Sequence, residues 1–214
     1  MSSIRAVISD FGGVLTSPLS DSFAAFQDAS GISLEQLGQA MATMAARDGA
    51  NPLFELETGR MSEAEFLGSL SSQLSRQLGR DVDLDSFGER YFAHLEPNQP
   101  VIEYMYSLHE RGLKLAICTN NVREWSDRWR SKLPVEDIFD VIVDSAFVGT
   151  RKPEPRIYEL TLERLGVPAS AALLVDDIEL NCSAARELGM RAVWFRDAQQ
   201  AIAEIEAALS DPAG

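Results

Sequence analysis

Six polar residues stand at the ends of short apolar runs or just ahead of a helical pattern: Asp10, Thr119, Asn120, Lys152, Asp176 and Asp177. Carboxylates are ligands that Mg²⁺ prefers in proteins. A hydroxyl group, an ammonium group and the N-terminus of a helix all bind phosphoryl oxygens. If the fold brings these residues together, they can hold a magnesium ion and a phosphoryl group side by side.

Each of these residues alone also has an ordinary structural explanation. Asp10 comes just before two glycines and fits a turn, whereas Thr119 fits the N-cap of a following helix. Lys152 has polar and proline neighbours that are typical of a solvated surface. The adjacent Asp176 and Asp177 are harder to explain, because burying carboxylates at the end of an apolar strand is costly unless something binds them. The joint order of the residues favours a functional site.

Five short apolar runs predict β-strands at residues 4–9, 113–119, 141–144, 172–176 and 191–195. The runs after the first are accompanied by helical patterns at 101–108, 157–165 and 202–209, where apolar residues recur with helical spacing. This alternation predicts an α/β fold, namely a Rossmann-like parallel sheet with helices on both faces. In such a sheet, ligands bind at the carboxyl ends of the strands. Asp10, Thr119 and Asp176 all stand at such ends.

The stretch between the first two predicted strands has helical spacing and loops but no strand pattern. We interpret it as an α-helical domain inserted after the first strand. The expected boundaries are residues 17–95 for this small domain, and 1–16 together with 96–214 for the sheet domain.

Composition excludes several classes of partner. The 214 residues carry a net charge of −14, which disfavours nucleic acid and anionic membranes because these need a positive surface. The two cysteines are too few for a disulfide framework and indicate a reducing compartment. No basic and apolar leader is evident, and no apolar run approaches the roughly 20 residues that span a bilayer. We therefore expect a cytoplasmic protein.

Four motifs, in this order, carry a resemblance to a known family: ISDFGGVLT, LAICTNN, GTRKPEP and LLVDDIELN. The chain resembles the haloacid dehalogenase (HAD) superfamily along its whole length, including the helical insertion of members with a type-1 cap. The segment DDIELNCSAARELGM is especially similar to the phosphatase domain that precedes many soluble epoxide hydrolases. The resemblance implies a hydrolase, most directly a phosphatase of small phosphorylated metabolites.

For the metal, the resemblance implies that Mg²⁺ is bound by Asp10 and by the backbone carbonyl of Gly12. A carboxylate of the acidic pair completes the set. We assign the direct bond to Asp177, with Asp176 acting through water or through its neighbours.

For the phosphate, the resemblance implies that Asp10 is the nucleophile and forms an aspartyl-phosphate. Thr119 and the backbone N–H of Asn120 are expected to bind the phosphoryl oxygens. Lys152 is expected to neutralise the nucleophile and the phosphate, and Asn181 to support the acidic loop.

One position departs from the phosphatase pattern. Phosphatases of this superfamily usually carry a second aspartate two residues after the nucleophile as general acid and base, but here that residue is Gly12. General acid–base catalysis typically contributes about 10²–10⁴-fold in rate. Good leaving groups, such as those of sugar 1-phosphates, acyl phosphates and aryl phosphates, are therefore expected. His94 and His109 are the two imidazoles in the chain, and neither has a strong case as a replacement.

Two alternatives remain open. One is a catalytically silent HAD-fold protein that binds a phosphorylated metabolite or a partner protein. The other is a haloacid dehalogenase, which also lacks the second aspartate but works without metal and does not keep an acidic pair in the fourth motif. The sequence is compatible with a monomer or a homodimer. Trp125 and Trp129, four residues apart, favour a core or dimer-facing stripe over a substrate platform.

Overall fold

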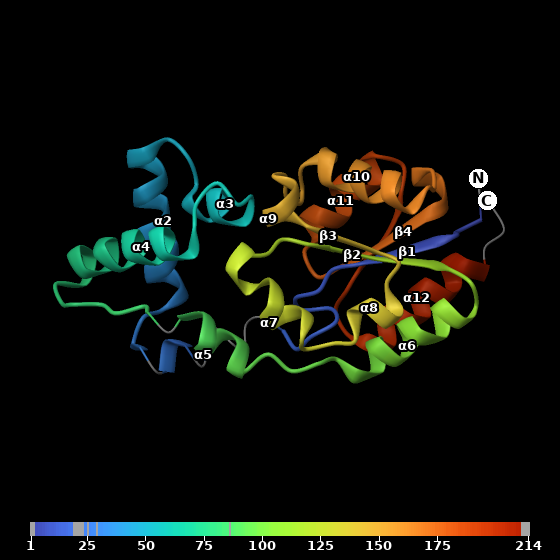
Figure 1. The fold of residues 1–214 in the computed structure, drawn as a ribbon, viewed down its shortest axis with the longest axis horizontal. Helices are drawn as coiled ribbons and strands as arrows, with labels where there is room; N and C mark the ends of the chain where they lie inside the picture. Colours follow the sequence, from blue (N-terminus) through green and yellow to red (C-terminus); the bar gives the residue numbers. More distant parts are fainter. Residues whose placement is uncertain (1–2, 19–23, 25, 29, 86, 211–214) are drawn as a thin grey trace.

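The computed structural model describes residues 3–18, 24, 26–28, 30–85 and 87–210, and Figure 1 shows its fold. A five-stranded parallel sheet has the order β3-β2-β1-β4-β5. Its strands are β1 (Ala6–Ser9), β2 (Lys114–Thr119), β3 (Val141–Asp144), β4 (Ala172–Asp176) and β5 (Arg191–Trp194). All five predicted strands are confirmed, with ends that differ by at most two residues.

The strands are mostly apolar because both faces of the sheet are covered. Every residue of β1 and of β4 is buried, as expected for central parallel strands. The register places Ser9 opposite both Ile117 and Val175. The polar residues that follow β1, β2 and β4 therefore lie next to one another at the carboxyl edge of the sheet.

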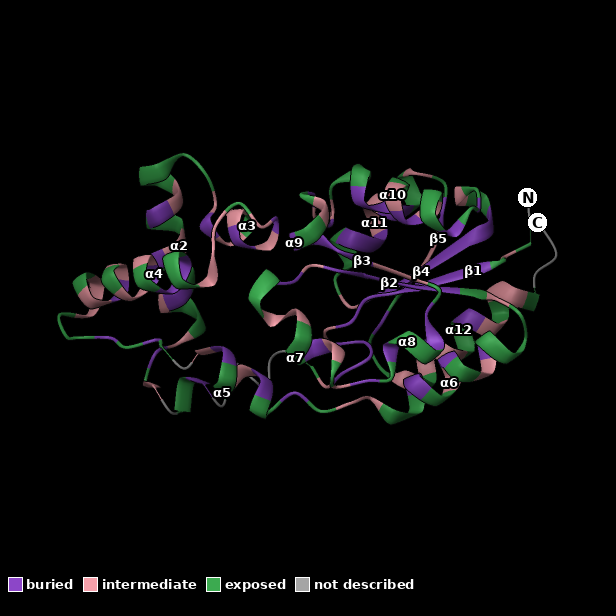
Figure 2. Ribbon diagram, in the orientation of Figure 1, coloured by how far each residue is buried: buried purple, intermediate pink, exposed green. Residues whose placement is uncertain are grey.

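Helices pack on both faces of the sheet, as predicted (Figures 1 and 2). On one face, α6 (Gln99–Glu110) and α12 (Ala198–Ser210) cover one set of alternating strand side chains, which includes Val7. On the other face, α10 (Pro155–Leu165) and α11 (Glu179–Glu187) cover the set that includes Ile8. The short helical elements around the sheet are η1 (Arg123–Trp125), α7 (Ser126–Arg130), α8 (Val135–Ile138), α9 (Ser145–Val148) and η2 (Ala169–Ala171).

Between β1 and α6 the chain forms a helical insert with its own apolar core. Its longer described helices are α2 (Leu34–Asp48), α3 (Pro52–Glu57), α4 (Glu63–Leu78) and α5 (Phe87–Ala93). Ser33 and Ser62 begin α2 and α4 with reciprocal side-chain and backbone hydrogen bonds, which satisfy N–H groups that a helix leaves unpaired at its start. In its described part this stretch contains no strand longer than a single bridge, and Figure 1 shows it to one side of the sheet.

The chain enters and leaves the helical insert at the same place. Thr16 and Pro97 form an isolated antiparallel bridge, and the Ser17 N–H donates to the Glu96 carbonyl at 2.7 Å. The Asn98 side chain donates to the Val14 carbonyl at 2.9 Å. The two linkers are thus tied to each other beside the carboxyl edge of the sheet. None of the described helices combines the length and apolar character needed to cross a bilayer.

Candidate active site

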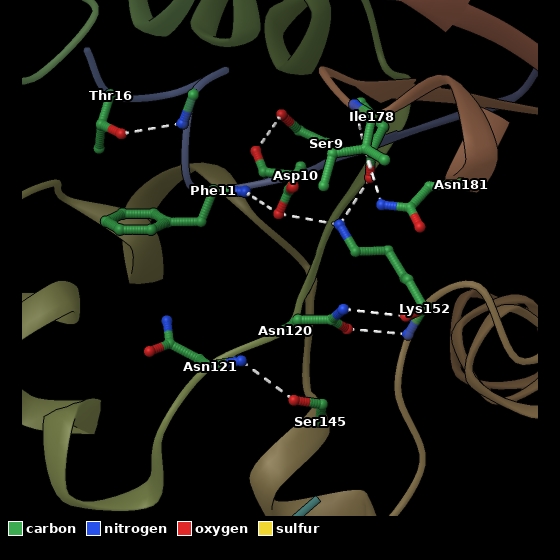
Figure 3. Close-up of polar contacts among 12 residues, drawn as sticks. Ser9, Asp10, Phe11, Thr16, Asn120, Asn121, Ser145, Lys152, Ile178 and Asn181 are labelled. Atoms are coloured by element: carbon green, nitrogen blue, oxygen red, sulfur yellow. Dashed lines mark hydrogen bonds and ion pairs between the residues drawn. The ribbon is translucent and has the colours of Figure 1, made fainter. Parts of the chain in front are cut away.

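Asp10 lies directly after β1, at the centre of the carboxyl edge (Figure 3). Its N–H donates to the Val175 carbonyl at 2.9 Å, which continues the pairing of β1 with β4. Its Oδ1 accepts the Phe11 N–H at 2.7 Å and lies 2.9 Å from Lys152 Nζ. The carboxylate is therefore held in one orientation by a backbone donor and by an ammonium group.

Lys152 is a buried cation, only 1% exposed, and not a solvated surface residue. Its Nζ donates to Asp176 Oδ2 at 2.7 Å and also contacts Asp10. The Asn120 side chain fixes the lysine backbone from both sides: its Oδ1 accepts the Lys152 N–H at 2.8 Å, and its Nδ2 donates to the Lys152 carbonyl at 3.0 Å (Figure 3). The sequence predicts a role only for the backbone N–H of Asn120, because its side-chain bonds to a residue 32 positions away leave no local pattern.

The two adjacent aspartates have different environments. Asp176 is fully buried, and its Oδ1 accepts the Ile178 N–H and Asn181 Nδ2, both at 2.9 Å. The bond from Asn181 confirms its predicted support of the acidic loop. Asp177 is partly exposed, and its carbonyl accepts Trp194 Nε1 at 3.0 Å. Carboxylate oxygens of Asp10, Asp176 and Asp177 lie within 4.8 Å of one another.

The site carries more negative charge than its own cation balances. The pKa of Asp10 is raised to about 7: burial raises it most, the attraction of Lys152 lowers it, and repulsion from Asp176 and Asp177 raises it. Burial also raises the pKa of Asp177, with repulsion from Asp176 as the next cause. Burial by itself lowers the pKa of Lys152, but attraction to Asp10 and Asp176 outweighs it and raises that pKa. Three clustered carboxylates against one ammonium group fit a hard divalent cation such as Mg²⁺.

Gly13 makes room for the acidic pair. It has a φ of +74°, and a Cβ built on it collides with the Asp177 carboxylate. The two glycines after Asp10 predict a turn here, but the need to leave space for the distant Asp177 carboxylate is not evident from the sequence.

Gly13→Ala is therefore expected to cost about 1–3 kcal/mol of unfolding free energy through backbone strain and, in addition, to weaken Mg²⁺ binding by displacing Asp177. Gly49→Ala is the matched control, since Gly49 has a φ of +75° and nothing within 4 Å of its added Cβ. Thermal melts and magnesium titrations of both variants separate the two effects. Equal magnesium affinities in the two variants would contradict this role of Gly13.

Thr119 ends β2 and is only 2% exposed. Within residues 3–18, 24, 26–28, 30–85 and 87–210, its hydroxyl has no hydrogen-bond partner on another residue. Buried polar groups are nearly always paired, so an unpaired hydroxyl beside Asp10 and Lys152 marks a position for a ligand atom.

A cavity of about 360 Å³ opens from this cluster toward the helical insert. Its base contains Asp10, Thr119, Lys152 and Asp177, and its walls come mainly from the insert. Of the sequence-predicted site residues, Asp176 is the one that does not line it.

Contacts between the insert and the sheet region border the cavity and were not predictable from spacing. Arg151 Nε contacts Glu57 Oε2 at 2.5 Å, and the Ser145 hydroxyl donates to the Glu57 carbonyl at 2.5 Å. The same Ser145 oxygen accepts the Asn121 N–H at 3.0 Å. These residues are far apart in the sequence and have no motif in common, so their contacts are evident only from the folded structure.

The two tryptophans differ in how deeply they are buried. Trp129 is fully buried against Phe11, as predicted for a core residue. Trp125 is partly buried and packs against the apolar cores of the sheet region and of the insert, in agreement with the predicted core role, and it also lines the cavity. His94 and His109 are exposed, and neither is among the described residues that line the cavity.

Comparisons with known proteins agree with this geometry. A family model described as haloacid dehalogenase-like hydrolase matches residues 4–189. Phosphatase MT3486 of Mycobacterium tuberculosis is 33% identical over 195 residues, which cover 89% of this chain and 86% of that protein. Bifunctional epoxide hydrolase 2 of Sus scrofa is 23% identical over 218 residues, which cover 95% of this chain and 38% of that protein. The chain spans only 20% to 38% of the length of the mammalian relatives at the head of this comparison.

A solved structure of a HAD family enzyme from Bacteroides thetaiotaomicron, in complex with magnesium and inorganic phosphate, is 22% identical with a TM-score of 0.64. The match covers 90% of this chain and 94% of that one, and it shows a common fold. The predicted resemblance, including that to the epoxide hydrolases, is confirmed. With its family model, its parallel sheet and its order of motifs all in agreement, this chain belongs to the haloacid dehalogenase-like hydrolase family.

Proposed function

We propose that this hydrolase is a Mg²⁺-dependent phosphatase of small phosphomonoesters that works through a phospho-Asp10 intermediate. The observation that carries the proposal is the cluster of the Asp10, Asp176 and Asp177 carboxylates, of which Asp10 and Asp176 contact the buried Lys152 ammonium group. The unpaired Thr119 hydroxyl beside it supports a phosphoryl position. Relatives named as phosphatases, including glyceraldehyde 3-phosphate phosphatase of Pyrococcus abyssi at 33% identity over 108 residues, add support.

The proposal includes the remaining expectations. Residues 17–95 act as a cap over the sheet domain, formed by residues 1–16 and 96–214. The two described cysteines, Cys118 and Cys182, are buried and unpaired, which supports a reducing, cytoplasmic location. The partner is a small phosphorylated metabolite, not nucleic acid or membrane, and the protein is a monomer or a homodimer.

The chemistry follows from how the side chains are held. A carboxylate oxygen of Asp10 attacks the phosphorus atom in line with the ester oxygen, the O–P bond breaks, and the leaving oxygen departs as an anion that takes its proton from water. Lys152 and the Thr119 hydroxyl donate to the phosphoryl oxygens, and water then hydrolyses the aspartyl-phosphate. The metal would be held by Asp10, Asp177 and the Gly12 carbonyl, with Asp176 behind them. When bound, Mg²⁺ neutralises charge on the carboxylates and the phosphate.

Turnover of p-nitrophenyl phosphate, with Mg²⁺ and with EDTA, tests the function. We expect phosphate release that requires the metal. No turnover of this substrate, or of a screen of about a hundred phosphorylated metabolites, would favour the silent binding protein. Metal-independent halide release from 2-chloropropionate would instead show a dehalogenase.

Asp177→Asn is expected to weaken Mg²⁺ binding more than Asp176→Asn, by at least about 10-fold. The reason is that both oxygens of Asp176 already bond to Lys152, Ile178 and Asn181, whereas the Asp177 carboxylate is partly exposed in the cavity. Calorimetric titration of both folded variants measures the difference. Equal or reversed losses would contradict the assignment of the direct bond to Asp177.

The reaction rate is expected to depend steeply on the pKa of the leaving alcohol, because Gly12 cannot donate a proton to it. Each pKa unit corresponds to about 1.4 kcal/mol in proton affinity. Sugar 1-phosphates, acyl phosphates and aryl phosphates are therefore favoured over sugar 6-phosphates. A series of substituted aryl phosphates measures the slope, which should flatten in a Gly12→Asp variant. A flat profile in the wild type would show that another residue already donates the proton.

A further inference from the structure

The walls of the cavity above Asp10 are apolar. Side chains from α2, α3 and α4 line it, including Leu37, Met41, Leu56, Phe66, Leu67 and Leu70. The volume of about 360 Å³ lies within the range of about 300–1,000 Å³ found for pockets that bind small molecules. Because the phosphoryl position is at the base of this cavity, the organic part of a substrate has to occupy the space between these side chains.

Several polar atoms along the same walls are already engaged by the protein. Glu63 Oε1 accepts Trp125 Nε1 at 2.7 Å, and Glu57 is paired with Arg151. The side-chain oxygen of Asn121 accepts the Val122 N–H at 2.9 Å. A substrate with several hydroxyl groups, such as a sugar, would compete with these bonds or bury its own hydroxyls unpaired.

One wall consists of aromatic rings. Phe87, Tyr91 and Trp125 all line the cavity, and the ring planes of Tyr91 and Trp125 are stacked at 5.2 Å with an angle of 24°. Phe87 is stacked with both of them at 6.2 and 6.3 Å. Since the Trp125 N–H is bound to Glu63, the indole contributes apolar surface to the wall. Aromatic surfaces of this kind favour a flat ring.

We propose that the substrate is a phosphomonoester of an apolar phenol, whose ring and alkyl substituents fill the cavity while its phosphate lies at Asp10. This specificity rests on the phosphatase function proposed above. Good leaving groups are expected because Gly12 cannot donate a proton, and phenols are one class of such leaving groups. In the first step the phenolic C–O bond stays intact, the O–P bond breaks, and the phosphoryl group passes to Asp10. The phenolate leaves and takes its proton from water.

A series of phenyl, 4-methylphenyl and 4-propylphenyl phosphates tests the class, because the pKa of the leaving phenol changes little while apolar volume grows. We expect kcat/KM to rise at least about 10-fold from phenyl to 4-propylphenyl phosphate. An analogue with a hydroxyl at the end of the propyl chain should lose that gain. Glucose 1-phosphate should be a poorer substrate than 4-propylphenyl phosphate.

Met41→Gln and Leu78→Gln form a matched pair of variants. Both residues are partly buried apolar side chains packed on the core of the insert, but Met41 lines the cavity and Leu78 does not. Met41→Gln should reduce the ratio of kcat/KM between the propyl and unsubstituted substrates. Leu78→Gln should keep the wild-type ratio.

Calorimetric binding of benzylphosphonate and 4-propylbenzylphosphonate, which cannot be hydrolysed at the P–C bond, gives a readout without turnover. Tighter binding of the propyl compound together with no hydrolysis of any ester would overturn the phosphatase function but support the apolar site. Hydrolysis of p-nitrophenyl phosphate with no gain from alkyl groups, in either rate or phosphonate affinity, would overturn the substrate class and leave the phosphatase function standing.

Discussion

Asp10→Asn is expected to reduce phosphate release by at least about 10⁴-fold, as the loss of a covalent nucleophile does in other hydrolases. The asparagine is nearly isosteric and can still accept the Phe11 N–H that now binds Asp10 Oδ1 at 2.7 Å, so the variant should fold. Initial rates with p-nitrophenyl phosphate measure the loss. Beryllium fluoride with Mg²⁺, a mimic of phospho-aspartate, should raise the melting temperature of the wild type but not of the variant.

Asp144→Asn is the control for removing a buried carboxylate at the end of a strand. Asp144 is 4% exposed, burial raises its pKa to about 6, and its side chain accepts the Ala146 N–H at 3.0 Å. It does not line the cavity, so its variant should retain activity within a few-fold. Wild-type rates in Asp10→Asn would exclude the phospho-aspartate mechanism.

Lys152→Met is expected to lower the free energy of unfolding by about 3–5 kcal/mol at pH 8 without metal, because it leaves buried carboxylates without their cation. The rate should fall by about 10²–10³-fold as well, through the lost donor to the phosphoryl group. The stability deficit should shrink at pH 5.5. Burial raises the pKa of Asp10 to about 7 even with Lys152 present, and losing the lysine's attraction raises it further. The folded variant therefore gains a proton, and stability, as the pH falls.

Urea unfolding of wild type and variant at both pH values measures this deficit. Lys114→Met is the control, since Lys114 is exposed and its Nζ donates to the Leu165 carbonyl, not to a carboxylate. Its effect should be small and independent of pH over this range. A deficit in Lys152→Met that stays constant with pH would contradict the electrostatic explanation.

The sheet was predictable because burial on both faces leaves a simple pattern. The run of residues 172–176 is entirely buried in β4, so its apolar composition reports its environment directly. The order of polar residues after these strands was equally informative, because parallel strands bring their carboxyl ends to one edge. Asp10 and Asp176 were thus placed correctly near each other from their positions, whereas the pairing of Lys152 with Asp10 was implied by the resemblance to the HAD superfamily.

Other features depend on contacts that no local pattern encodes. The burial of Lys152 was not evident from its polar neighbours, because it results from two carboxylates that arrive from β1 and β4. The contact between Arg151 and Glu57 joins residues 94 positions apart. The place of Trp125 in the cavity wall was not evident, because a helical spacing of four fits a core stripe and a cavity wall equally well. Distinguishing them requires the position of the insert.

The central place of β1 in the sheet has a consequence for how the protein is made. Of the five strands, β1 leaves the ribosome before the others, and the two strands that pair with it begin only at Lys114 and Ala172. Such long-range pairing slows folding, because a large loop has to close before any contact is gained. The segment bearing Asp10 therefore has its apolar side chains unprotected until β4 has been synthesised. Nascent chains arrested before residue 172 should consequently remain sensitive to protease at β1 and depend on chaperones.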